Sequence, residues 1–367
     1  MINKYKKIVI KIGSSSIISE KTKKIKVSWL NSICNDIKFL HPNKQIIIVC
    51  SGAIALGSKI INSKKIIKKL EDKQAAAAIG QIELIKCWEQ SLKKHRIHSG
   101  QILLTLDDSE VRRRYLNVRK TINALHKKNI IPIINENDTV ATEEIRFGDN
   151  DRLAARVSQM IDADLLVLLS DVDGLYSESP IKNKNAKKIK EVFKIDSNIE
   201  KMASKNISNL GSGGMITKIW AAKICLNSGC STVITSGNKI NPLRGITKQN
   251  STWFYAEKSP QSSRKQWLLN HLHPSGTVVI DQGALKAINN NKSLLPAGVT
   301  EIIGRFNRGD IITILNTKNI KIGIGVIAYD SSDAKKIIRK NSKDIKNILG
   351  YEGRDELIHK DDLVKIK

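Results

Sequence analysis

The sequence predicts an α/β protein with an open, mainly parallel β-sheet sandwiched by helices, followed by a small mixed β-barrel domain. Two observations predict this arrangement. Up to about Phe254, short runs of Ile, Val and Leu alternate with segments of helical periodicity, and the runs are apolar on both faces, as in buried parallel strands. After Phe254 the chain contains short strand-like segments separated by tight turns.

The strands of the sheet are predicted from apolar runs, such as the one that ends at Cys50 and the one that ends at Ser170. The helices are predicted from apolar residues that recur every three or four positions; one of them is rich in alanine. In chain order, the predicted strands are 6–12, 45–51, 101–105, 130–135, 164–170 and 232–235. The predicted helices are 28–40, 75–90, 115–127, 149–162 and 215–228.

A polar stretch, 256–266, separates this pattern from the C-terminal part and indicates a linker. We therefore predict a first domain over 1–256, a linker over 257–272 and a second domain over 273–367. The second domain is expected to contain strands at 276–281, 299–304, 310–315 and 321–328, and helices at 283–290 and 331–339.

Composition excludes several classes of protein. The chain has 367 residues, of which 41% are hydrophobic and 26% charged, as is ordinary for a globular protein. We find no run apolar enough to span a membrane and no apolar signal core before the first strand, so a cytoplasmic location is expected. The five cysteines lack Cys-x-x-Cys spacing and the histidines lack metal spacing, so neither a disulfide nor a protein-held metal is expected.

The net charge of +27 favours polyanionic partners such as RNA. The lysines, however, are spread along the whole chain together with abundant Ile and Asn. We favour compositional drift on solvated faces as the explanation, and keep RNA binding as the alternative.

Chemically useful residues follow the predicted strands. Lys11 and Gly13, Ser51 and Gly52, 135–138, and 170–171 all come directly after apolar runs. Because the carboxyl ends of parallel strands meet at one edge of a sheet, we expect these residues to line one ligand site.

Two glycine loops indicate phosphoryl transfer. Lys11 precedes a Gly-Ser-Ser-Ser loop, and Gly211, Gly213 and Gly214 open a helix that carries Lys218. Backbone N–H groups in such loops bind phosphate, and two lysines can neutralise charge that moves between two oxygens. The chain contains no Gly-x-x-x-x-Gly-Lys-Ser/Thr, so the site is not a P-loop.

Each of these features also has a simpler interpretation. Glycine clusters occur in flexible loops, and Ser51 suits a helix N-cap as well as a donor to a carboxylate. The acidic residues of 135–138 and 148–151 suit a substrate ammonium, Mg²⁺ or the orientation of the two lysines, but they also suit Asx turns. Because loops carry function disproportionately, we favour a functional role.

These motifs occur together in one known family. They are Lys11-Ile-Gly-Ser-Ser, Val49-Cys-Ser51-Gly-Ala-Ile, Asn135-Glu-Asn-Asp138, Gly148-Asp-Asn-Asp151, Ser170-Asp171 and Gly213-Gly-Met-Ile-Thr-Lys218. The set resembles the amino-acid kinase family, and within it the bacterial kinases that phosphorylate the side-chain carboxylate of glutamate, which also match at 51–57, 80–90 and 100–105. The C-terminal part, with 293–298 and 306–310, resembles the PUA domain (pseudouridine synthase and archaeosine transglycosylase type).

The resemblance implies that the chain transfers the γ-phosphate of ATP to L-glutamate, giving L-glutamyl 5-phosphate, the first step of proline biosynthesis. The catalytic residues would be Lys11 and Lys218, which flank the phosphoryl group, and Asp151, which orients both lysines. Mg²⁺ would bridge phosphate oxygens, and the enzyme would be a homo-oligomer, either a dimer or a tetramer.

The resemblance also implies the binding residues. Those for glutamate would be Ser51, Asp138 and Asn150, with Asn135 and Asp149 near the ammonium. Those for ATP would be Lys11, Gly13, Ser14, Ser170, Asp171, Ser212, Gly213, Gly214, Met215, Ile216, Thr217 and Lys218.

Three positions depart from the family pattern. Arg146 stands where the family usually has Lys, and Ser170 and Ser212 stand where it has Thr. The serines keep a hydroxyl, whereas Arg keeps the charge but not the reach of Lys. The alternatives to this function are another carboxylate or carbamate kinase of the same fold, and an RNA-binding protein that uses its basic surface and the PUA-like domain.

Overall fold

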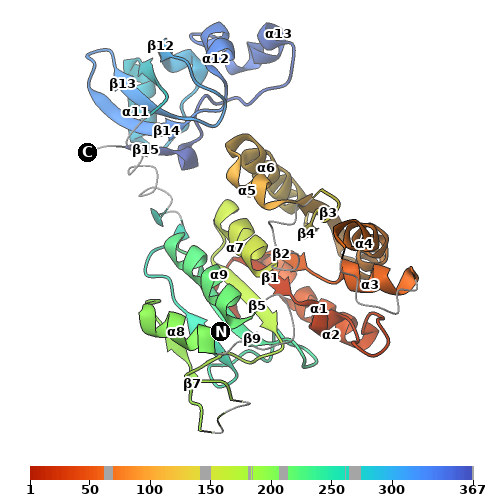
Figure 1. Cartoon of the computed structure of the whole chain (residues 1–367). Helices are drawn as coiled ribbons and strands as arrows, with labels where there is room; N and C mark the ends of the chain where they lie inside the picture. Colours follow the sequence, from red (N-terminus) through yellow and green to blue (C-terminus); the bar gives the residue numbers. More distant parts are fainter. Residues whose placement is uncertain are drawn as a thin grey trace. The chain divides into compact units, whose positions relative to one another are not determined.

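A computed structural model of the chain describes residues 1–61, 69–140, 150–180, 183, 185–205, 214–260, 262–263 and 274–365. The chain divides into two compact units, Met1–Pro260 and Gln261–Lys367 (Figure 1). Most of the predicted linker, 257–272, lies outside the described residues.

The first unit is built on an eight-stranded sheet. Its strand order is β3 (His98–Leu104), β4 (Ile130–Glu136), β2 (Gln45–Cys50), β1 (Lys7–Ile12), β5 (Leu165–Ser170), β9 (Ser231–Ser236), β10 (Ser251–Phe254) and β8 (Glu191–Val192). The strands from β3 to β9 are parallel to one another, and β10 is antiparallel to β9. The predicted mainly parallel sheet is therefore confirmed. The sequence analysis missed β10, which ends at the residue taken as the start of a new region, and β8, which is too short to show a pattern.

Helices cover both faces of this sheet (Figure 1). Successive residues of β1 alternate between two hydrophobic cores: Ile8 packs in the core of Trp29 and Trp88, whereas Val9 packs in the core of Leu153. The helices are α1 (Ser14–Ile17), α2 (Val27–Leu40), α3 (Ala53–Ile60), α4 (Leu70–Lys93), α5 (Leu106–Glu110), α6 (Arg112–Lys127), α7 (Asn150–Met160), α8 (Ser197–Lys205) and α9 (Met215–Asn227). Helices α2 and α4 supply residues to the first core, and α6, α7 and α9 to the second.

Helices α3 and α4 approach each other closely because glycine occurs at their contact. A Cβ atom on Gly57 would lie 1.7 Å from the carbonyl oxygen of Ala76, and one on Gly80 would lie 1.9 Å from that of Ala53. The contact therefore holds the backbone of α4 against the first turn of α3, which directly follows Ser51.

We expect Gly80→Ala to lower the free energy of unfolding by about 3 kcal/mol, because the added methyl group meets backbone atoms that cannot rotate away. Helix propensity alone would favour alanine by about 1 kcal/mol, so the clash should reverse the usual sign. Urea unfolding would measure the change. As a control, Gly245→Ala adds a methyl group whose nearest neighbour lies at 3.5 Å; a similar loss there would show that the close helix contact is not the cause.

The second unit contains a five-stranded mixed sheet in the order β12-β11-β13-β14-β15. Strands β11 and β13 are parallel and the other pairs are antiparallel. Its elements are β11 (Gly276–Ile280), α11 (Gln282–Asn289), β12 (Val299–Gly304), β13 (Ile311–Asn316), β14 (Lys321–Val326), α12 (Ser331–Ile337), α13 (Ile345–Leu349) and β15 (Leu363–Lys365). The predicted mixed β domain is confirmed, with its own core around Ile280, Ile312 and Leu357.

Two expectations from composition can be compared with the structure. All five cysteine thiols are free, and all except Cys87 are buried, as expected for core residues. Among the helices that the structure describes, none combines the length and the apolar character that a membrane span requires.

Candidate active site

Two lysines and an aspartate meet at the carboxyl end of the parallel sheet. Lys11 Nζ lies 2.6 Å from Asp151 Oδ1, and Lys218 Nζ lies 3.0 Å from Asp151 Oδ2. The three side chains come from β1, the first turn of α7 and the first turn of α9. Their exposed fractions are only 7%, 1% and 5% for Lys11, Asp151 and Lys218. One buried carboxylate thus holds two buried ammonium groups that lie far apart in the sequence.

The charge balance of this cluster is unusual. Burial alone would raise the pKa of Asp151, but the ammonium groups of Lys11 and Lys218 outweigh burial and hold that pKa well below its ordinary value. Two buried ammonium groups share this one carboxylate, and the phosphate oxygens of a bound anion could pair with both of them, so this cluster is a strong candidate for a phosphoryl site.

The N-terminus of α9 adds further donors. Its N-cap residue is Gly214, which has no side chain to cap the helix, and no described atom lies within 4 Å of the position that a Cβ on Gly214 would take. The hydroxyl Oγ1 of Thr217 lies 3.0 Å from Asp151 Oδ2 and 2.9 Å from the carbonyl oxygen of Gly214. Uncapped backbone N–H groups at a helix start attract anions.

A second polar cluster lies beside the first and contains no charged member. Asn150 Nδ2 lies 2.7 Å from the carbonyl oxygen of Cys50, 2.7 Å from Ser51 Oγ and 3.0 Å from Asn135 Oδ1. The cluster joins the ends of β2 and β4 to the start of α7. Because the Asn150 amide can only donate from nitrogen, Ser51 Oγ accepts at this contact and its own hydrogen stays available to a ligand.

The two clusters are connected through consecutive residues of α7. Asn150 and Asp151 are adjacent, and neighbouring positions on a helix point in different directions. Asn150 therefore reaches the ends of β2 and β4, whereas Asp151 reaches β1 and α9. The result is a cationic site next to a neutral hydrogen-bonding site, as a phosphoryl donor and a polar acceptor together require.

Asp138 lies just beyond β4 and is half-buried. Burial raises the pKa of this carboxyl to about 6. A carboxylate in such surroundings is stabilised by a bound cation such as an ammonium group.

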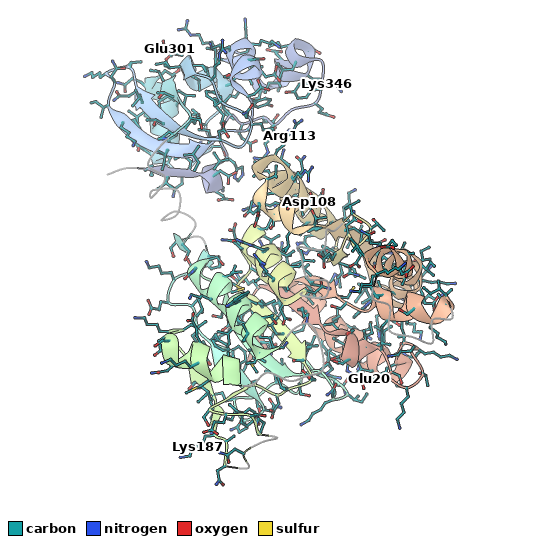
Figure 2. All side chains as sticks on the ribbon, in the orientation of Figure 1. Glu20, Asp108, Arg113, Lys187, Glu301 and Lys346 are labelled. Carbon is teal, nitrogen blue, oxygen red and sulfur yellow. The ribbon has the colours of Figure 1, made fainter. Side chains whose placement is uncertain are left out.

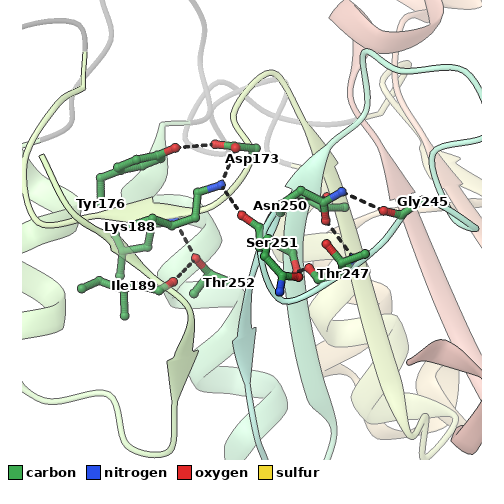
Figure 3. A network of polar contacts seen from close by, with 12 residues as sticks. Asp173, Tyr176, Lys188, Ile189, Gly245, Thr247, Asn250, Ser251 and Thr252 are labelled. Carbon is green, nitrogen blue, oxygen red and sulfur yellow. Dashed lines mark hydrogen bonds and ion pairs between the residues drawn. The ribbon is translucent and has the colours of Figure 1, made fainter. Parts of the chain in front are cut away.

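The loop after β5 is anchored by a polar network (Figure 3). Asp173 accepts hydrogen bonds from Lys188 and from Tyr176 Oη, the latter at 2.9 Å. Thr252 Oγ1 accepts from the backbone N–H of Leu175 at 2.8 Å. These contacts fix the chain directly after Ser170 and Asp171, the two predicted nucleotide contacts of this loop; Ser170 Oγ also lies 2.8 Å from Asp171 Oδ1.

The structure thus brings together many of the predicted site residues. Lys11, Asp151, Lys218 and Thr217 form one cluster, and Ser51, Asn135 and Asn150 form the second. Gly13 lies near the first cluster, since a Cβ on it would be 3.9 Å from Lys11 Nζ, and Ser14 follows it as an exposed residue of α1. Met215 is buried and Ile216 half-buried in the first turn of α9. Arg146, Asp149, Ser212 and Gly213 lie outside the described residues.

One residue of the second cluster was missed by the sequence analysis. Asn135 Nδ2 donates to Gln81 Oε1 at 2.7 Å, which adds a side chain from α4 to the site. In the sequence Gln81 is one polar position within a long helix, so its spacing gave no signal. The signs that covered it were the family match over 80–90 and the neighbouring Gly80, which permits the close approach of α4 to α3.

Charged side chains and possible metal ligands can be located in the described part of the chain. The exposed side chains of Arg113, Lys187 and Lys346 project from separate parts of the chain (Figure 2). Within the described ranges, no group of three or more His, Cys, Asp or Glu residues is arranged to hold a metal ion.

Comparisons with known proteins show the family of this chain. The model of the amino acid kinase family matches residues 6–236, and the model of the PUA domain matches residues 276–349. The chain belongs to the amino acid kinase family.

Its relatives within that family are glutamate 5-kinases. The glutamate 5-kinase of Paramagnetospirillum magneticum is 48% identical over 361 residues, covering 98% of this chain and 97% of that protein. The glutamate 5-kinase of Sinorhizobium fredii is 50% identical over 365 residues, covering 99% of this chain and 93% of that protein. A solved carbamate kinase from Giardia lamblia bound to AMP-PNP is similar with a TM-score of 0.49 and 15% identity, over 69% of this chain and 99% of that chain. A similarity of that size does not bear on the function of this chain.

Proposed function

We propose that this chain is a glutamate 5-kinase, which transfers the γ-phosphate of ATP to the side-chain carboxylate of L-glutamate and so forms L-glutamyl 5-phosphate in the first step of proline biosynthesis. The observation that carries the proposal is the pair of buried lysines held by one buried aspartate, Asp151. The identity of nearly half of all residues to glutamate 5-kinases over almost the whole chain supports the choice of substrate.

The reaction requires no general base. A side-chain carboxylate oxygen of glutamate forms a bond to the γ-phosphorus, and the bond from that phosphorus to the bridging oxygen breaks, which releases ADP. The acceptor is already ionised, so the protein must position the reactants and neutralise charge. Lys11 and Lys218 stabilise the negative charge on the transferring group from two sides, and Asp151 keeps both ammonium groups in place.

The second cluster receives the acceptor. The Ser51 hydroxyl, whose hydrogen is available, donates to a carboxylate of glutamate, and Asn150 contributes the adjacent amide. The Asp138 carboxylate pairs with the ammonium. Asn135 and Asp149 lie near that ammonium in the proposal; of these two, the described residues include only Asn135.

The nucleotide binds on the other side of the two lysines. Lys11, Gly13, Ser14 and the start of α9 contact the phosphates, and Ser170 and Asp171 contact the nucleoside, since they lie at the end of β5 next to β1. The residues of the 212–218 loop complete the phosphate contacts. Mg²⁺ fits this site as an ion carried by ATP, because the cluster offers donors to phosphate oxygens, and the ion supplies further charge neutralisation when bound.

ATP-dependent formation of a hydroxamate in the presence of hydroxylamine and Mg²⁺ tests this function, because hydroxylamine traps an acyl phosphate. We expect product from L-glutamate, and little from aspartate, N-acetylglutamate or carbamate. Strong reaction with another acid and none with glutamate would assign the chain to another kinase of the same fold. The same assay with proline present tests whether proline inhibits the enzyme.

The pH dependence of glutamate binding is the next expected result. Since burial raises the pKa of Asp138 to about 6, the carboxylate that pairs with the ammonium is present above that pH and lost below it. At saturating ATP, KM for glutamate should rise about tenfold per pH unit below this pKa. Asp138→Asn should raise KM at neutral pH and remove this acid limb, whereas KM for ATP should stay within about twofold of the wild-type value. A loss of ATP affinity instead would contradict the assignment of Asp138 to the acceptor.

The same raised pKa predicts the sign of a stability effect. Because the folded state favours the protonated carboxyl, the burial of Asp138 destabilises the fold above the folded pKa and no longer does so below the ordinary pKa of aspartate. Asp138→Asn should therefore unfold at a higher temperature than the wild type near pH 8, and the difference should vanish near pH 4. A variant that binds glutamate poorly yet is more stable would separate a binding role from a structural one.

Three further parts of the proposal concern assembly. We propose domain limits of 1–256 and 273–367, a dimer or tetramer, and an RNA contact of the PUA domain as a second function. The RNA contact is supported by the match to the PUA domain and by the net charge of +27. Binding that is equally strong for structured RNA and for heparin, and that vanishes with salt in both cases, would contradict specific RNA recognition.

A further inference from the structure

Gln81 is positioned to belong to the acceptor site. It lies on α4 directly after Gly80, the residue that brings this helix against the start of α3. Its Oε1 accepts a hydrogen bond from Asn135 Nδ2 at 2.7 Å, so its side chain ends beside the second cluster. The two residues in this contact are 54 positions apart in the sequence.

A backbone group fixes the orientation of both amides. The backbone N–H of Glu136 can only donate, and it donates to Asn135 Oδ1 at 2.9 Å. Asn135 Nδ2 must therefore face Gln81, and the atom of Gln81 that meets it must be the acceptor Oε1. The Gln81 nitrogen Nε2 is consequently directed elsewhere. It is buried, and no described atom accepts a hydrogen bond from it.

The same reasoning applies to Asn150. The carbonyl oxygen of Cys50 can only accept, so Asn150 Nδ2 must be the atom that meets it at 2.7 Å. Asn150 Oδ1 then points away; within the described part of the chain this buried oxygen has no hydrogen-bond partner, although Asn150 is only 3% exposed. Besides the Ser51 hydroxyl hydrogen, the cluster thus presents an open donor on Gln81 and an open acceptor on Asn150.

Buried polar groups of this kind nearly always have a partner, so the pair indicates a ligand with one acceptor and one donor. The α-carbon of an amino acid carries both: a carboxylate that accepts and an ammonium that donates. Gln81 Nε2 cannot pair with an ammonium, because both would donate. It can pair with the α-carboxylate.

The order of the strands gives the direction of the substrate. The site of phosphoryl transfer lies at the end of β1, whereas Asn135 ends β4, which is separated from β1 by β2 alone. Neighbouring strands are about 4.8 Å apart, so the Gln81 end of the site is displaced about 10 Å from the lysines. A glutamate whose side-chain carboxylate reaches the lysines therefore directs its α-carbon toward Gln81.

We propose that Gln81 Nε2 donates a hydrogen bond to the α-carboxylate of bound glutamate, while its Oε1 holds Asn135 and Asn150 Oδ1 accepts from the ammonium. Gln81 is thus a residue that selects, among acids with a reactive side-chain carboxylate, those that also carry a carboxylate at the other end, where the α-carboxylate of glutamate lies. The proposal rests on the proposed function for the identity of the substrate. The competing interpretation is that Gln81 only ties α4 to β4.

Gln81→Glu separates the two interpretations. Glutamate at this position keeps an oxygen that accepts from Asn135 Nδ2, so a purely structural role is preserved. It replaces the donor NH₂ with an oxygen of negative charge, which would repel an α-carboxylate. We expect the Kd of the full-length protein for L-glutamate, measured by calorimetry, to rise about 100-fold, and the Kd for ATP to stay within about twofold of wild type.

Substrate analogues locate the contact. Glutarate lacks the ammonium and 4-aminobutyrate lacks the α-carboxylate. Gln81→Glu should weaken the binding of glutarate as strongly as that of glutamate. It should leave the binding of 4-aminobutyrate unchanged or make it tighter. Gln81→Met removes the donor without adding charge. It should raise the Kd for glutamate and for glutarate about tenfold, and the Kd for 4-aminobutyrate by less than about twofold. It provides a second test if the first variant is unstable.

Gln90→Glu is the matched control, since Gln90 is an exposed residue of the same helix. An unchanged Kd for glutamate in Gln81→Glu would overturn the proposal, as would equal losses for all three acids or an equal loss for ATP. The hydroxamate assay on the wild type decides the proposed function separately. The wild type could bind glutamate without forming hydroxamate, while Gln81→Glu no longer binds glutamate. In that case the proposed function is wrong and the proposed contact of Gln81 with glutamate is supported. If the wild type binds none of the three acids, both are overturned.

Discussion

Lys218→Ala is expected to lower kcat about 100- to 1,000-fold while KM for glutamate changes by less than about threefold. The reason is that the Lys218 ammonium, buried and 3.0 Å from Asp151 Oδ2, is most needed when charge develops on the transferring phosphoryl group. In the proposed function, glutamate itself is bound by the neighbouring neutral cluster. Steady-state kinetics with each substrate varied in turn would measure the separation.

Lys223→Ala is the matched control for this result. Lys223 lies on the same helix, but its side chain is 52% exposed and pairs with Glu200 at the surface. Its replacement should leave kcat unchanged, because exposed ion pairs contribute little and Lys223 does not face the site. An unchanged kcat in Lys218→Ala, or an equal effect of both substitutions, would contradict the role given to Lys218.

Much of this site could be predicted from sequence because it follows from the geometry of parallel sheets. Runs that are apolar on both faces identified β1, β2, β4 and β5, and the polar residues after such strands must meet at one edge. Lys11, Ser51 and Asn135 were predicted in this way. The resemblance to a known family then supplied their roles, and the structure pairs both lysines with Asp151, the residue that was predicted to orient them.

The rest depends on contacts that no spacing encodes. Gln81 reaches the site only because two glycines allow α3 and α4 to touch, and the direction of its amide is decided by a backbone N–H more than 50 positions away. Strand β10 was missed because its Ser-Thr-Trp-Phe segment lies at the edge of the parallel region, where its antiparallel pairing with β9 supplies the order. In both cases tertiary packing, rather than local pattern, determines the structure.

Asp151→Asn is expected to affect both activity and stability. The substitution removes the buried carboxylate that pairs with both Lys11 and Lys218. Loss of one partner from a buried ion pair destabilises a protein by about 3–5 kcal/mol, and we expect an effect of that size on the free energy of unfolding. Because the lysines lose the group that orients them, kcat should fall about 100-fold or more. Urea unfolding and steady-state kinetics would measure the two effects.

The response of this variant to ATP distinguishes lost charge from lost packing. Phosphate groups supply the negative charge that the substituted amide side chain lacks, so saturating MgATP should raise the melting temperature of Asp151→Asn more than that of the wild type. If the variant is destabilised merely by poor packing, MgATP should raise its melting temperature no more than it raises that of the wild type. Asp162→Asn is a suitable control, because Asp162 pairs with Arg119 at 2.6 Å away from the two lysines. If MgATP stabilises Asp151→Asn less than it stabilises Asp162→Asn, the buried positive charge is not what attracts the phosphates, and the assignment of the transfer site to Lys11 and Lys218 is wrong.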